Sequence, residues 1–173
     1  MGTITPQNVE MERTGSHHVS DDYARGGYRE QVFGYFKATW RGEPVIVTMQ
    51  ADRYTHSSGL SDWRIYAEQA RSFDPERNGG RGDDLTDTAR GRLSDACKPL
   101  MAAWLDSDEY APSLANAVRN MIVREMKDRH TSTAPRLLET YGDRLTATQH
   151  DAITTALAAR DAYHAATEKA GNA

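Results

Sequence analysis

The chain has 173 residues, of which 38% are hydrophobic and 27% are charged, a length that suits one domain or a domain with an appendage. Its net charge of −4 is spread evenly along the sequence, which argues against a strongly basic nucleic-acid binder and against a long acidic tail. The apolar residues recur in periodic segments, and this pattern predicts a folded protein rather than a disordered one.

The N-terminal segment, residues 1–25, mixes proline, serine, threonine, glycine and charged side chains without periodicity. Such a composition is typical of a flexible or extended tail. The glycine pair at Gly26 and Gly27 marks its end. We therefore expect the first regular element to begin after this pair.

Two alternating runs then predict a β-hairpin. The strand over residues 28–40 places four apolar side chains on one face: Val32, Phe36, Ala38 and Trp40. The strand over residues 45–54 does the same with Val45, Val47, Met49 and Ala51. We expect Trp40 to lie opposite Val45, because the two apolar faces then coincide, as register specification requires.

A third strand is predicted over residues 62–73, with Trp63, Ile65 and Ala67 on its apolar face. It continues the antiparallel meander if Ile65 lies opposite Met49. The following residues, 74–82, read DPERNGGRG, and their proline, asparagine and glycine content predicts a flexible connection.

Four helices are predicted in the rest of the chain. The first is capped by Asp83 or Asp84 and carries an apolar stripe from Leu85 to Trp104, with a kink or a break expected at Pro99. The others cover residues 112–127, 135–141 and 147–169. The last of them begins at a capping box formed by Thr146 and Gln149.

This order of elements predicts an α+β fold, in which a three-stranded antiparallel β-meander precedes about four helices. After the tail, residues 26–106 would hold the meander and the first helix. Residues 107–173 would form a helical part packed as one unit with the preceding segment.

The face of the meander that points away from the apolar side chains carries the main functional hypothesis. The expected register aligns Tyr35, Gln50 and Arg64 in one row. Exposed aromatic and cationic side chains can anchor a protein partner or stack on nucleic-acid bases. The alternative is that a helix or the tail covers this face as core. The candidate partner-binding residues are Arg29, Phe33, Tyr35, Lys37, Arg64 and Tyr66.

Motifs of catalysis and metal binding are not evident. The sequence has no nucleophile elbow, no phosphate-binding P-loop and no HExxH, so we assign no catalytic residue and no cofactor. His17 and His18, with Asp21 and Asp22, come nearest to a metal-ligand pattern, but they fall in the predicted tail, and we assign no metal site. The single cysteine, Cys97, has apolar neighbours and is expected to be a buried thiol.

The N-terminus lacks the basic and apolar regions of a signal peptide, and no run approaches the ~20 apolar residues of a membrane span. We therefore expect a cytoplasmic protein without a membrane partner. The excess of arginine over lysine, 17 to 4, is typical of a high-GC genome, such as an actinobacterium or one of its phages or plasmids.

The leading functional hypothesis is a small macromolecule-binding protein, with a protein partner favoured and a regulatory or inhibitory role. Two alternatives stay open. One is a single-stranded nucleic-acid binder that uses the same aromatic and cationic face. The other is an enzyme with no recognisable motif, which would need distant polar side chains brought together in a pocket. The sequence leaves the oligomeric state open.

Overall fold

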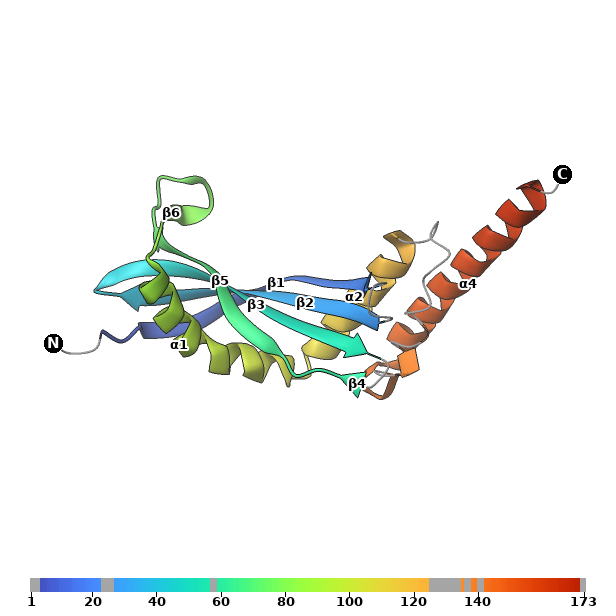
Figure 1. Cartoon of the computed structure of the whole chain (residues 1–173), viewed down its shortest axis with the longest axis horizontal. Helices are drawn as coiled ribbons and strands as arrows, with labels where there is room; N and C mark the ends of the chain where they lie inside the picture. Colours follow the sequence, from blue (N-terminus) through green and yellow to red (C-terminus); the bar gives the residue numbers. More distant parts are fainter. Residues whose placement is uncertain are drawn as a thin grey trace. The chain divides into compact units, whose positions relative to one another are not determined.

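The structure is a computed structural model that describes residues 4–22, 27–56, 59–124, 135, 138–139 and 142–171. Strands precede helices, so the fold class is α+β as predicted (Figure 1). The strands are β1 (Gln7–Asp22), β2 (Gly27–Trp40), β3 (Glu43–His56), β4 (Gly59–Leu60), β5 (Arg64–Phe73) and β6 (Arg81–Asp84). The helices are α1 (Asp87–Leu105), α2 (Tyr110–Arg124) and α4 (Ala147–Gly171), with short 3-10 turns at Asn78–Gly80 and Gly142–Arg144.

The antiparallel sheet has the strand order β1-β2-β3-β5-β6, and β4 pairs with the end of β3. The predicted meander corresponds to β2, β3 and β5, and β1 and β6 extend it on either side. The expectation of a tail over residues 1–25 is wrong for β1. This strand was missed because it is an edge strand with mostly half-buried or exposed polar side chains, so it lacks the apolar alternation of a half-buried strand.

The chain divides into two compact units, and each combines three separate segments. Unit 1 contains Met1–Ser16, Gln31–Arg53 and Asp62–Ser107. Unit 2 contains His17–Glu30, Tyr54–Ser61 and Asp108–Ala173. The division therefore passes through β1, β2 and β3.

In unit 1, helix α1 packs on strand β5 (Figure 1). The apolar side chains of the strands form the core of this unit. Gly34 of β2 lies so close to α1 that an added Cβ would come within 2.9 Å of the Met101 sulfur. The hydroxyl of Ser94 on α1 accepts a hydrogen bond from the backbone N–H of Ala67. The strand side chains in this core are Val32, Phe36, Ala38, Trp40, Val45, Val47, Met49, Ala51, Ala67 and Ala70.

The strand register differs from the expected one by two residues. Arg41 and Gly42 have positive φ angles of 56° and 86°, the pattern of a two-residue type I′ turn. This turn sets Trp40 opposite Glu43 instead of Val45. On the other side of β3, Met49 pairs with Ala67 and not with Ile65. A shift of two residues keeps the same side chains on each face, so the register error does not change which side chains point to the core.

Strand β5 contains an irregularity that the alternation did not predict. Thr48 pairs with Gln69 and Met49 pairs with Ala67, so Glu68 is an extra residue in β5. A β-bulge of this kind lets Ala67 and Ala70 both point into the core although they are three residues apart.

Helix α1 begins later than expected. Its N-cap is Thr86, whose hydroxyl accepts the N–H of Ala89, while Asp83 and Asp84 belong to β6. The helix continues through Pro99 as one element. Its buried side includes Cys97 and Met101, whereas Leu100, expected in the stripe, is 39% exposed.

In unit 2, helices α2 and α4 pack together, with Leu114, Val118, Met121 and Ile122 buried on α2 and Ile153 buried on α4. The capping box of α4 is present: Thr146 and Gln149 each accept the other's backbone N–H, at 3.3 and 2.9 Å. The helix predicted over residues 135–141 falls largely outside the described residues. No helix in the described ranges has the length and apolar character needed to cross a bilayer.

Candidate functional site

The outer face of the sheet in unit 1 is the face that points away from α1. Its members are Phe33, Tyr35 and Lys37 on β2, Thr48, Gln50 and Asp52 on β3, and Arg64 and Tyr66 on β5. Lys37 and Arg64 are exposed, and Phe33, Tyr35 and Tyr66 are half-buried. The intervening side chains, such as Val32 and Phe36, are buried against the core, as strand alternation requires.

Strand β1 supplies the first cation of this face. The guanidinium carbon of Arg13 lies 4.1 Å from the centre of the Tyr35 ring. Gly15 brings β1 close to the same ring, since a Cβ at this position would lie 2.8 Å from a ring carbon of Tyr35. Arg13 is exposed, and within the described parts of the chain the Tyr35 ring is its contact partner. Sequence reasoning missed Arg13 because it assigned β1 to a tail.

The lysine of the outer face is paired. The Lys37 ammonium lies 2.5 Å from the Glu12 carboxylate on β1. The hydrogen bond and the charge of Glu12 raise the pKa of Lys37. Both side chains are well exposed, so we expect this ion pair to contribute little to stability.

The opposite side of the outer face carries a second arginine–tyrosine pair. The guanidinium carbon of Arg64 lies 5.2 Å from the centre of the Tyr66 ring. The Tyr66 hydroxyl donates to a carboxylate oxygen of Asp52 at 3.1 Å, and the Gln50 amide donates to the other at 2.8 Å. Asp52 and Gln50 are buried, so the tyrosine ring is held in place by polar contacts beneath it.

Arg29, the remaining candidate, belongs to unit 2. Its guanidinium carbon lies 5.7 Å from the centre of the Tyr54 ring in the same unit. The structure therefore brings Phe33, Tyr35, Lys37, Arg64 and Tyr66 together in unit 1 and places Arg29 in a separate aromatic contact.

A buried polar cluster in unit 2 was not predicted. Both nitrogens of the His17 ring form hydrogen bonds. Nε2 lies 2.8 Å from the Glu30 carboxylate, and Nδ1 lies 2.9 Å from the Ser113 hydroxyl. The hydroxyl of Tyr110 donates to the same Glu30 oxygen, and Glu30 is fully buried. The only sequence signal for this cluster was Glu30, because the alternation of β2 places this glutamate on the same inward face as Tyr28 and Val32.

This cluster has the residue types of a serine–histidine–acid arrangement, but its geometry fits a structural role. A buried carboxylate needs hydrogen-bond donors, and His17 and Tyr110 supply them. The side chain of His17 is 4% exposed, which leaves the imidazole little access to a substrate. We therefore interpret the cluster as a structural one, whose hydrogen bonds hold β1, β2 and α2 together.

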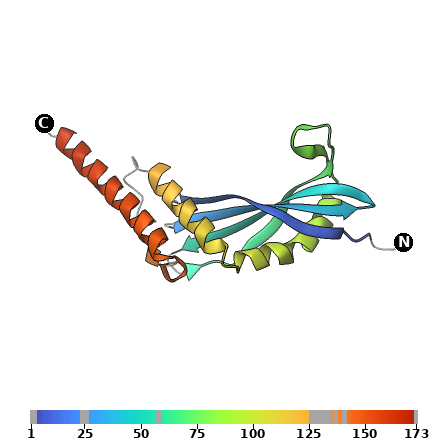
Figure 2. The same cartoon turned by 180° about the vertical axis from the view of Figure 1, so that it is seen from behind.

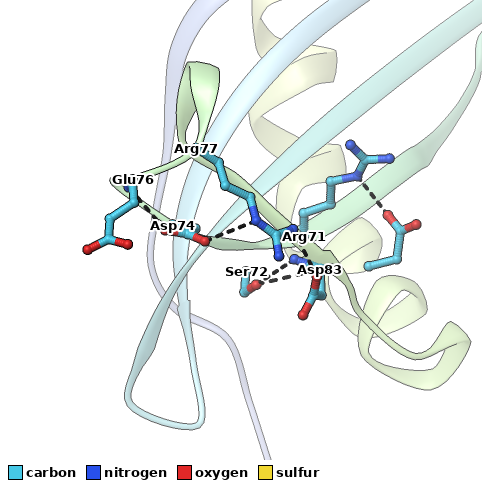
Figure 3. A network of polar contacts seen from close by, with 7 residues as sticks. Arg71, Ser72, Asp74, Glu76, Arg77 and Asp83 are labelled. Carbon is cyan, nitrogen blue, oxygen red and sulfur yellow. Dashed lines mark hydrogen bonds and ion pairs between the residues drawn. The ribbon is translucent and has the colours of Figure 1, made fainter.

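The segment between β5 and β6 is also more ordered than predicted. Both views show it extending away from the rest of unit 1 (Figures 1 and 2). Arg77 pairs with Asp74 and Asp83 at 3.1 and 2.9 Å, and the Ser72 hydroxyl accepts the N–H of Asp83 (Figure 3). The flexible connection expected here is thus a hairpin held by ion pairs and backbone hydrogen bonds.

The described residues contain no group of three or more histidine, cysteine or acidic side chains placed to hold a metal ion. Comparisons with protein-family models, with curated proteins and with solved structures found no match for this chain.

Proposed function

We propose that the protein binds another protein through the outer face in unit 1. The observation that supports this most directly is the pair of exposed arginines, Arg13 and Arg64, each held over a tyrosine ring. Arginine and tyrosine are enriched at protein–protein interfaces, where their large and partly apolar surfaces contribute strongly to affinity.

The charge pattern of the outer face favours a protein over a nucleic acid. Glu12 neutralises Lys37, and the buried carboxylate of Asp52 lies beneath Tyr66. A face that follows a phosphate backbone needs a continuous run of unpaired cations, because its affinity comes from neutralising phosphates. A mixed face with aromatic anchors suits a protein partner with its own mixture of charged and apolar groups.

The arginine–tyrosine contacts also support a preformed surface. A guanidinium resting on an aromatic ring has fewer accessible rotamers than a solvated one. Binding then orders fewer side chains, and the entropy cost of association is smaller. A small protein with such a surface, and without recognisable catalytic chemistry, suits a regulatory or inhibitory role.

The test is affinity capture from a lysate of the source cells, with the substitutions Arg13→Gln and Arg64→Gln combined. Both arginines are exposed, so the double variant should fold normally. Arg90→Gln on α1 is the matched control, since Arg90 is also exposed and its ion pair with Asp87 lies on the helix. The proposal expects a protein retained by the wild type and by the control, with at least ~10-fold less retained by the double variant.

Equal retention by all three proteins would contradict the proposed surface. A second measurement tests the nucleic-acid alternative: a gel shift with single-stranded oligonucleotides at about 50 and 200 mM salt. If the gel shift disappears at the higher salt and in the double variant, the partner of the outer face is a nucleic acid and not a protein.

A further inference from the structure

A separate pocket lies in unit 1 where the β2–β3 turn meets the start of α1. Its volume is about 340 Å3, at the lower end of the range for small-molecule sites. The residues that matter for its chemistry are Trp40, Arg41, Glu43, Val45, Leu85 and Ala89. None of them belongs to the outer face.

The hairpin turn explains how these side chains meet. The two-residue turn sets Trp40 opposite Glu43, so both side chains point to the face that packs on α1. Val45 follows two residues later on the same face. Ala89, in the first turn of α1, is small enough to leave space above them.

The floor of the pocket is apolar. Trp40, Val45 and Ala89 are 7%, 3% and 3% exposed, so they are fixed by the core beneath them. Leu85 adds a half-buried aliphatic wall, and its backbone N–H is bonded to the carbonyl of Ala70. Such a floor takes an aliphatic or aromatic group, because burial of apolar surface is favourable.

The rim carries two opposite charges. Arg41 and Glu43 are both exposed, and within the described ranges neither forms an ion pair with another side chain. The guanidinium carbon of Arg41 lies 6.0 Å from the centre of the Trp40 ring, which places the cation above the apolar floor. Glu43 stands two residues further along the chain, on the other side of Gly42.

We propose that this pocket binds a small zwitterion with an apolar side chain, that is, a free aliphatic or aromatic α-amino acid. The apolar side chain would rest on Trp40, Val45 and Ala89. Arg41 would bind the carboxylate through its paired N–H donors, and Glu43 would accept the ammonium. The site is independent of the outer face, so either proposal can fail without the other.

The experiment is isothermal titration calorimetry of the whole chain with leucine and three relatives. Leucinamide lacks the carboxylate, N-acetyl-leucine lacks the ammonium, and glycine lacks the side chain. Three variants are compared: Arg41→Asn, which keeps a residue suited to positive φ, Glu43→Gln, and Ala89→Leu, which fills the pocket. Glu76→Gln, at an exposed position of the β5–β6 hairpin, is the matched control.

The proposal expects leucine to bind the wild type and Glu76→Gln with a dissociation constant below about 1 mM. Arg41→Asn should weaken the binding of leucine at least 10-fold and leave the binding of leucinamide unchanged. Glu43→Gln should also weaken the binding of leucine at least 10-fold, and it should leave the binding of N-acetyl-leucine unchanged. Ala89→Leu should abolish binding while circular dichroism stays that of the wild type.

Three results would overturn the proposal. The first is no binding of leucine at about 10 mM, which leaves no useful affinity. The second is equal affinity for leucine, leucinamide and N-acetyl-leucine, since the rim charges would then play no part. The third is binding of leucine that neither Arg41→Asn nor Ala89→Leu changes, because the ligand would then sit elsewhere. Arg41→Asn keeps the test decisive if Ala89→Leu fails to fold.

Discussion

The imidazole Nε2 of His17 on β1 lies 2.8 Å from the Glu30 carboxylate on β2, in the interior of unit 2. This contact joins a strand with no clear sequence signal to one that the alternation predicts. Because Glu30 is fully buried, its carboxyl oxygens need hydrogen-bond partners within the protein. His17 and Tyr110 provide them, and Ser113 completes the hydrogen bonds of the imidazole.

The first prediction concerns this cluster. Glu30→Ala should lower the free energy of unfolding by about 3–5 kcal/mol, because His17 and Tyr110 lose a shared buried acceptor. Tyr110→Phe removes one hydrogen bond and should cost only about 1–2 kcal/mol. Chemical denaturation measures both, and Glu76→Ala at an exposed position is the control. A loss below about 1 kcal/mol for Glu30→Ala would refute the structural role of the cluster.

The second prediction concerns the β2–β3 turn. Arg41 adopts a φ of 56°, which is costly for a side chain of its type, whereas asparagine followed by glycine is the preferred type I′ sequence. Arg41→Asn should therefore raise the free energy of unfolding of the ligand-free protein by about 0.5–1 kcal/mol. Thermal unfolding measures the change. Arg41→Val is the opposing control and should destabilise the protein, because a β-branched residue disfavours positive φ.

The third prediction concerns the start of α4. Thr146→Ala removes the acceptor for the N–H of Gln149 and should weaken the first turn by about 1 kcal/mol. Hydrogen exchange at residues 149 and 150 should accelerate accordingly. Thr148→Ala is the matched control, since Thr148 is exposed in the same turn but does not cap the helix. Equal exchange in the two variants would show that the capping box contributes nothing in solution.

The fourth prediction concerns Cys97, whose burial raises its thiol pKa to about 12. The native protein should resist iodoacetamide at neutral pH and react only after unfolding, because the thiolate is the nucleophile.

The same shift makes stability depend on pH. The unfolded thiol ionises near pH ~8.5, and the folded one does so only at higher pH. The stabilisation linked to the protonated thiol is therefore complete below the pKa of the unfolded thiol. It is lost as the pH rises from that pKa towards 12. Unfolding free energies of the wild type minus those of Cys97→Ala, measured from neutral to alkaline pH, should fall accordingly. A flat difference would contradict the burial of the thiol.

Several elements were predictable because they depend on local patterns. The alternation in β2 and β3 identifies the two strands and the side chains of each face. Thr146 and Gln149 identify the start of α4, since a capping box requires only residues three apart. The candidate residues of β2 and β5 share the outer face despite the error in register, because a shift of two residues preserves the alternation.

The rest depended on tertiary structure. Edge strand β1 carries few apolar residues, so its place is decided by backbone pairing with β2 rather than by its own pattern. Arg13 meets Tyr35, and His17 meets Glu30, only because this pairing aligns residues far apart in sequence. The register followed from the conformation of Arg41 and Gly42, which the residue types alone did not specify. Periodicity determined which side chains are buried on each strand, and long-range pairing decided which of them became neighbours.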